Sequence, residues 1–136
     1  YTKYYVHMNK NKNLILIGTL GAIAVALGAF GAHGLKSLLT EVQMSTFETG
    51  IRYHFYHTFA ILGAAILTKN RASKPLNIAI ILFIVGIILF SGSLYLLSCK
   101  DILGIESWTF LGPITPLGGA CFIAGWVMFI IKGIKG

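Results

Sequence analysis

Charged residues are scarce in this chain of 136 residues: they make up 11% of it, and only four of them are acidic. An average soluble domain has about 25% charged residues, so the composition argues against a domain surrounded by water. Hydrophobic residues reach 56%, and the mean hydropathy is +0.79. The composition therefore indicates an integral membrane protein.

Cysteine is also rare, and the two that occur, Cys99 and Cys121, are not placed to pair. The first is expected at a helix end and the second about a dozen residues into the next helix. At about 1.5 Å of rise per residue, their depths differ too much for an easy disulfide. We expect both to be free thiols.

Catalytic and cofactor motifs are absent from the sequence. It contains no nucleophile elbow, phosphate loop, dinucleotide fingerprint or paired-carboxylate motif. It also lacks closely spaced histidines and cysteines of the kind that ligate metals. We therefore expect no enzymatic activity, no catalytic residue, no metal and no cofactor.

Apolar stretches long enough to cross a bilayer, about 20 residues each, are present instead. They fill most of the chain and leave no room for a second domain. The sequence predicts an all-α integral membrane four-helix bundle, a single domain over 14–136 preceded by a cytoplasmic segment, 1–13. The expected spans are 14–32, 51–67, 76–98 and 108–131.

The basic residues fall mainly on one side of these spans. Eight of the eleven lie before the first span, between the second and third, or after the fourth, whereas all four acids lie in the other two connections. An excess of lysine and arginine marks cytoplasmic loops, so we expect both termini in the cytoplasm. The net charge of +7 then reflects topology and contact with the lipid bilayer, not nucleic acid.

The beginning of the chain has alternative interpretations. The lysines, apolar run and small residues of 8–34 resemble a secretory signal with Ala29 and Gly31 near a cleavage point, but a run of 19 residues is long for a signal core. Residues 1–7, ahead of Met8, are either native or a remnant of expression.

Small residues form two rows along the first span. One row runs from Gly18 to Ala29 through Ala22 and Ala26, and the other from Gly21 to Ala32 through Ala24 and Gly28. Spacings of three and four place each row on one helical face. Two such faces suggest that neighbouring helices approach closely on both sides. Packing within the bundle is the favoured explanation, and a surface for a homo-oligomer or a partner in a membrane complex is the alternative.

The sequence also indicates where helices begin, end or are interrupted. Thr40 and Gln43 fit a capping box that begins the second helix well before its span, unless Gly50 breaks that helix. Gly34 is expected to stop the first helix, and the leucines that follow it suggest a segment in the membrane interface. In the last span Pro113 and Pro116 interrupt backbone hydrogen bonding, and Gly118 and Gly119 leave space for a neighbour.

Aromatic residues are assigned to the two membrane surfaces. Tyr95 and Trp108 are expected in the outer interface, and Trp126 with Lys132 in the inner one.

Polar residues from four separate parts of the chain are expected to meet near the outer third of the bilayer. The second span opens with "FETGIRYHFYH", where Glu48 and Arg52 are spaced as an intrahelical ion pair. Ionisable side chains in a membrane usually face the bundle interior. The candidate binding cluster comprises His33, Glu48, Arg52, His54, His57, Ser91, Ser93, Tyr95 and Thr115.

Four segments resemble a known family of small membrane proteins. "GAFGAHGL", "FETGIRYHFYH", "FSGSLYLL" and "ITPLGG" are similar to the signature segments of inner-membrane proteins catalogued as a domain of unknown function, related to transmembrane protein 256. The resemblance covers nearly all of 14–131, and the residues before Met8 are the one departure. It implies a four-helix protein of a bacterial inner membrane without an assigned activity.

Function is therefore left between several hypotheses. The first is a structural, accessory or assembly role in which the polar residues hold the helices together. The second is a small-ligand or ion binding or transport site at the polar cluster. A metal or haem site using His33 with His54 or His57 is less favoured, and an enzyme least of all.

Overall fold

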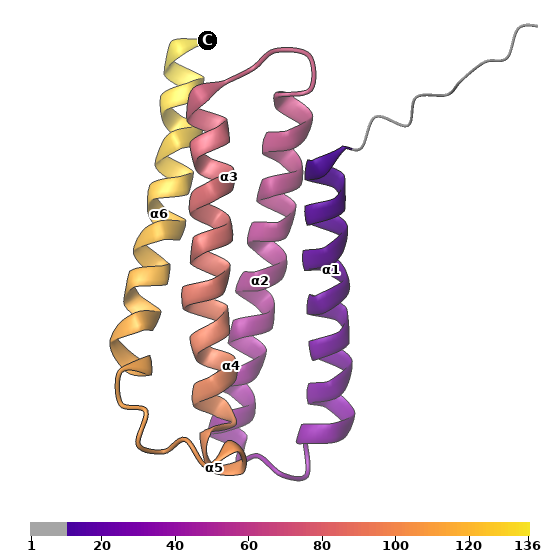
Figure 1. Cartoon of the computed structure of the whole chain (residues 1–136), viewed down its shortest axis with the longest axis vertical. Helices are drawn as coiled ribbons and strands as arrows, with labels where there is room; N and C mark the ends of the chain where they lie inside the picture. Colours follow the sequence, from indigo (N-terminus) through magenta and orange to yellow (C-terminus); the bar gives the residue numbers. More distant parts are fainter. Residues whose placement is uncertain (1–10) are drawn as a thin grey trace, which may run out of the picture.

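The computed structural model describes residues 11–136, which form helices and the connections between them. Most of the predicted cytoplasmic segment, including residues 1–7, lies outside the described residues. The long helices run alongside one another, and the start of α1 and the end of α6 lie at the same end of the molecule (Figure 1). Several elements join end to end to form one helix, as α3, η2 and α4 do. The elements are α1 (Lys12–Phe30), η1 (Gly31–Leu35), α2 (Glu41–Leu67), α3 (Lys74–Gly86), η2 (Ile87–Ser91), α4 (Gly92–Ser98), α5 (Lys100–Leu103) and α6 (Leu111–Lys135).

The helices pack in chain order, in a row. α1 packs against α2, α2 packs against α3, η2 and α4, and these pack against α6. The α3 and α6 pair has the most extensive contact, and α1 and α6 form the two edges of the row (Figure 1). The predicted all-α membrane bundle is confirmed, with α2 and the α3 to α4 helix in its middle.

Within residues 11–136, three helices are apolar and long enough to cross a membrane: Lys12–Leu35, Lys74–Ser98 and Leu111–Lys135. α2 is not among them, because the charged and polar residues of its first half lower its hydropathy. It nevertheless lies between α1 and α3 (Figure 1), so it occupies the same layer as its neighbours. This least apolar of the long helices is packed on both sides, by α1 and by the α3 to α4 helix.

The start of α2 follows the predicted capping box. Thr40 Oγ1 accepts from the Gln43 backbone N–H at 3.2 Å, and Gln43 Oε1 accepts from the Thr40 N–H at 2.9 Å. Gln43 Nε2 also donates to Asp101 of α5 at 2.6 Å. Gly50 does not break α2, because Tyr95 and Leu94 pack against its bare backbone.

Other boundaries differ from those expected. The first helix continues through Gly34 as a π turn to Leu35. The chain from Lys36 to Thr40 is a short connection, and Val42 belongs to α2, so no separate interfacial helix forms there. The last helix begins at Leu111, after the connection that holds Trp108.

A reciprocal contact of phenylalanine and glycine joins α3 to α6. The ring of Phe83 in α3 lies against Gly125 in α6, and the ring of Phe122 in α6 lies against Gly86 in α3. A Cβ atom on either glycine would overlap the facing ring. Phe83 is completely buried and belongs to the main apolar core, so this contact holds the centre of the bundle.

Gly118 brings α6 against the backbone of η2. A Cβ atom there would overlap the backbone of Phe90, whereas one on Gly119 would make ordinary contact with the Phe90 ring. The predicted space for a neighbour is therefore confirmed most sharply at Gly118. Pro116 lies inside α6 without ending it, and Pro113 lies in the first turn, where no intrahelical bond to its nitrogen is required.

The small residues of α1 do not meet neighbours on both faces. Gly18, Ala22, Ala26 and Ala29 are all exposed, because α1 lies at the edge of the row and packs against α2 on one side. On the second face Ala24 is buried, while added Cβ atoms on Gly21 and Gly28 would meet nothing within 4 Å. The expectation of close neighbours on both sides is wrong within this chain.

Candidate functional site

His57 of α2 is buried among three aromatic side chains. Its ring stacks on Phe122 of α6, with centroids 3.4 Å apart and planes 4° apart, and it lies 5.2 Å from the Phe83 ring. The imidazole is 4% exposed. The helical phase of α2 explains this position, because Gly50, His54 and His57 recur at spacings of four and three and so face the rest of the bundle.

Both nitrogens of His57 have partners. Nδ1 lies 2.8 Å from the Tyr53 carbonyl oxygen, and Nε2 lies 3.2 Å from Nε1 of Trp126. A carbonyl can only accept and an indole N–H can only donate. His57 is therefore neutral, with its hydrogen on Nδ1 and the lone pair of Nε2 accepting from Trp126.

A groove of about 530 Å³ lies beside this histidine, between α2 and α6. Tyr53, Tyr56 and Trp126 line it and are 40%, 56% and 45% exposed. Its remaining lining is mostly apolar: Phe90, Gly119, Phe122 and Ile123. The groove runs along the side of the helices, so it opens laterally and is not enclosed by them.

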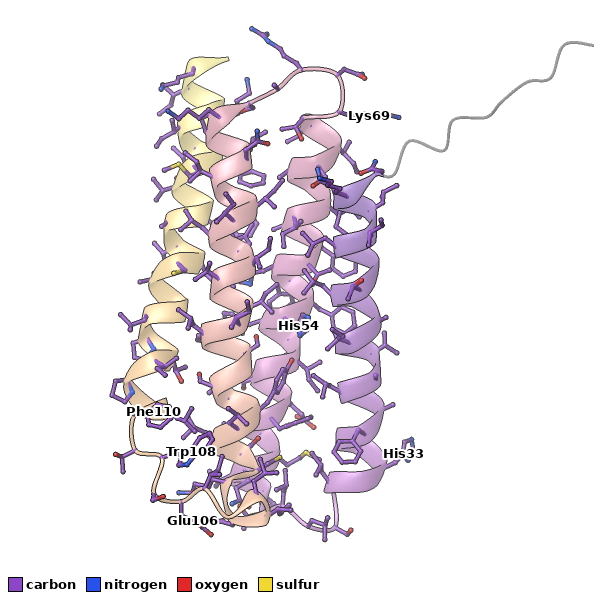
Figure 2. All side chains as sticks on the ribbon, in the orientation of Figure 1. His33, His54, Lys69, Glu106, Trp108 and Phe110 are labelled. Carbon is purple, nitrogen blue, oxygen red and sulfur yellow. The ribbon has the colours of Figure 1, made fainter. Side chains whose placement is uncertain are left out.

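His54 makes a second polar contact, with the α3 to α4 helix. Its Nδ1 lies 3.0 Å from the hydroxyl of Tyr95. Nε2 is buried and has no hydrogen-bond partner among the described residues. Figure 2 shows His54 at about half the height of the bundle.

Ser93 and Thr115 form a third polar contact, between α4 and α6, with their hydroxyl oxygens 2.6 Å apart. Ser93 also donates to the Phe90 carbonyl. Ser91, at the end of the π turn, is fully buried, and its hydroxyl has no partner within the described part of the chain. The three polar contacts therefore connect α2 with α6, α2 with α4, and α4 with α6.

Three members of the predicted cluster are exposed and lie apart from these contacts. Glu48 and Arg52 are exposed, and Arg52 donates to Thr49 Oγ1 at 3.0 Å, not to Glu48. Arg52 follows Gly50 and precedes His54 by two residues each, which turns it about 200° away from the buried face. The expected sharing of these charges among the helices, and their ion pair, are therefore wrong.

His33 is also exposed, in η1, on the outer side of the bundle near the end of the first helix (Figure 2). It lies well below His54 in that view, so the two histidines do not meet at one depth. This separation argues against a metal or haem held between them. Among residues 11–136, no group of three histidine, cysteine or acidic side chains is placed to hold a metal ion.

Tyr95 and Trp126, which the sequence predicts as interface anchors, take part in contacts within the bundle. Each is bonded to a buried histidine of α2. Trp126 lies 15 residues from the start of α6 and nine from its end, and so nearer to the middle of that helix than to either end. Both aromatic residues serve contacts between helices.

Trp126 and Phe122 are the site residues that sequence reasoning missed. They lie four residues apart on α6, where an aromatic pair on one face is a signal for a packed surface. That signal does not reveal the partner, because 69 residues separate His57 from Trp126. Only the packing of α2 and α6 on α3 brings them together.

The fold and these contacts define a class: a small helical membrane protein whose buried polar side chains join its helices. Residues 27–119 match a family described as "Protein of unknown function (DUF423)". The chain belongs to this family, which confirms the resemblance noted in the sequence.

Curated relatives cover nearly the whole chain. The UPF0382 membrane protein YwdK of Bacillus subtilis is 40% identical over 126 residues, 91% of this chain and 98% of the relative. The UPF0382 inner membrane protein YgdD of Escherichia coli K12 is 39% identical over 122 residues, 90% and 88% of the two chains. A UPF0382 membrane protein of Haemophilus influenzae is 41% identical over 126 residues, which are 93% of this chain and 96% of the relative. No solved structure matches the chain.

Proposed function

We propose that this protein is a non-enzymatic structural, accessory or assembly component of a bacterial inner membrane. The observation that supports this role is the pairing of the buried polar side chains with one another. His57 bonds to Trp126, His54 to Tyr95 and Ser93 to a hydroxyl of α6. Groups committed to contacts between helices fix the helix register and are not free to bind a substrate.

The inner-membrane location is carried over from the relative YgdD, whose name includes it. The distribution of charge supports an orientation with both chain ends in the cytoplasm. The connection between α2 and α3 contains Lys69 and Arg71, while the opposite end contains Asp101 and Glu106. Single cysteines at Asn70 and Ser107 in a variant without native cysteines test this. A membrane-impermeant maleimide added to intact cells should label the second and not the first, and the reverse pattern would contradict the orientation.

The exposed small face of α1 supports an assembly role. Ala22, Ala26 and Ala29 leave a shallow surface on which another helix can approach closely. We propose that a second copy or another membrane chain packs there. Ala26→Leu should then weaken the association measured by crosslinking in native membranes, whereas Val25→Leu, at an exposed neighbouring position, should not.

A complementation experiment tests the structural role. If the polar contacts serve only to hold the bundle together, Tyr95→Phe and Thr115→Val should lower the amount of protein in the membrane. They should then restore the phenotype of a deletion strain only in proportion to that amount. A variant with normal abundance and no complementation would show that the contact has another purpose.

A second candidate function is ligand or ion binding or transport. The groove beside His57 favours it, as do the unpaired buried atoms of His54 and Ser91. Proteoliposomes that contain the protein should pass no ion under a gradient if the first proposal holds. Flux that is abolished by Ile123→Trp, which would fill the groove, would support the second.

A further inference from the structure

A cleft of about 430 Å³ lies between the beginning of α1 and the end of α2. Its polar lining comes from Asn11, Asn13, Thr68 and Lys69, and its apolar lining includes Leu14 and Leu62. Leu14 begins the apolar run of α1 and Thr68 directly follows α2. The lining of the cleft is therefore polar at the beginning of α1 and the end of α2, and it becomes apolar toward the middle of the bundle.

This end of the molecule is strongly basic. Figure 2 shows Lys69 there, at the opposite end from Glu106. The connection at 68–73 and the last turn of α6 contain no acidic residue. The described basic residues at this end are Lys12, Lys69, Arg71, Lys74, Lys132 and Lys135.

Backbone electrostatics add to this charge. The N-terminus of α1, which lines the cleft through Asn11 and Asn13, carries a partial positive charge, and the Asn11 side chain caps one of its N–H groups, that of Leu14. The C-terminus of α2 would oppose it, but its last carbonyls already accept hydrogen bonds. Thr68 donates to Ala64 and Ala65, and the Lys69 N–H donates to Ile66.

We propose that this cleft binds one anionic phospholipid. The phosphate lies by Lys69 and the amides of Asn11 and Asn13, and one acyl chain follows the seam between Leu14 and Leu62. The charge of the site is complementary to a phosphate group. The apolar half of the lining distinguishes a lipid from a soluble anion, because an inorganic phosphate would leave that surface without a partner.

Native mass spectrometry of the full chain, released from detergent with defined lipids, tests the proposal. The protein should retain phosphatidylglycerol in preference to phosphatidylcholine with the same acyl chains. Lys69→Gln should weaken this retention about five-fold, the effect expected for one basic side chain near a membrane surface. Lys135→Gln is the matched control: it removes the same charge at the same end of the molecule but lies at the end of α6, outside the cleft.

A second variant tests the acyl-chain part of the site. Ala65 lines the cleft, so Ala65→Trp should fill it and abolish the preference without a change in charge. Ala120→Trp, at an exposed position of α6 outside the cleft, is its control, and circular dichroism melting checks that each variant is folded.

Three results would overturn the proposal. An equal loss of phosphatidylglycerol retention in Lys69→Gln and Lys135→Gln would mean that the lipid is attracted to the whole basic end of the molecule and not to the cleft. Displacement of the lipid by equimolar inorganic phosphate would mean a site for a soluble anion. Unchanged retention in a folded Ala65→Trp variant would place the acyl chain elsewhere.

Discussion

The indole N–H of Trp126 donates to Nε2 of His57 across 3.2 Å, and the bond joins α6 directly to α2. Both helices also pack on the α3 to α4 helix. The two bonded residues form part of the lining of the lateral groove. The bond also fixes the tautomer of the histidine, whose other nitrogen faces the Tyr53 carbonyl. This hydrogen bond and the contact with the Tyr53 carbonyl together set the position and the protonation of a buried imidazole.

Trp126→Phe should destabilise the protein by about 1 kcal/mol. The variant keeps an aromatic ring against Phe83 and Phe129 but leaves His57 Nε2 without a donor. Contacts between polar side chains in membranes contribute about 0.6 kcal/mol on average and up to about 1.7, and a buried acceptor that loses its partner adds to the cost. Reversible unfolding in mixed micelles, followed by circular dichroism, measures the change.

Trp108→Phe is the control for this prediction, because Trp108 lies exposed in the connection before α6. It should change the free energy of unfolding by less than about 0.5 kcal/mol, as surface substitutions usually do. Equal effects of the two substitutions would mean that the bond to His57 contributes nothing measurable.

The contact between His54 and Tyr95 predicts a non-additive pair of substitutions. Tyr95→Phe leaves both ring nitrogens of His54 without partners, since Nε2 already lacks one, and His54→Leu leaves the Tyr95 hydroxyl unpaired. Each should cost about 1 to 2 kcal/mol. The double variant removes all of these polar atoms and should be more stable than Tyr95→Phe alone. A double variant whose loss equals the sum of the single losses would show that the two residues do not interact.

Local sequence signals predicted local structure well. The capping box of Thr40 and Gln43 formed because its partners lie three residues apart. The inward positions of His54 and His57 follow from helical spacing once the buried face of α2 is known. The prediction for Arg52 was wrong because the sequence shows only that a charged residue is present. The packing of the neighbouring helices determines which face of α2 is buried.

Contacts between distant helices were beyond the sequence. The sequence does contain a repeated pattern, in which a phenylalanine precedes a glycine by three residues: Phe83 and Gly86, and Phe122 and Gly125. Its meaning depends on the antiparallel register of α3 and α6, which places each ring on the other helix's glycine. The arrangement of the helices in a row was not predicted either. Short connections indicate that consecutive helices pack together, but they do not show whether the first and last helices also make contact.

Adjacent glycines in α6 should respond oppositely to alanine. In Gly118→Ala the new methyl group would overlap the backbone of Phe90, so α6 and η2 must separate, and we expect a loss of about 2 to 3 kcal/mol. In Gly119→Ala the methyl group makes ordinary contact with the Phe90 ring, and alanine favours the helix by about 0.5 to 1 kcal/mol. Thermal unfolding of both variants in the same detergent compares them, and equal stability would mean that the close approach at Gly118 is absent.

Gly125→Ala should destabilise the bundle, and a smaller residue at position 83 should restore part of the loss. The new Cβ would overlap the ring of Phe83, which is fully buried and has little freedom to move. Overpacking of this kind costs about 1 to 3 kcal/mol. Phe83→Leu alone leaves a cavity and is also expected to destabilise.

Together, the two substitutions should cost less than the sum of their separate effects, because the methyl group added at position 125 enters the space that the ring vacates. The free energies of unfolding of the four proteins form a double-mutant cycle, and we expect a favourable coupling of at least about 0.5 kcal/mol. Phe129→Leu in place of Phe83→Leu is the control: Phe129 contacts the Phe83 ring, whereas the three atoms nearest to a Cβ at Gly125 all belong to Phe83. Equal restoration by both substitutions would mean that general loosening of the core, not the reciprocal contact, relieves the overlap.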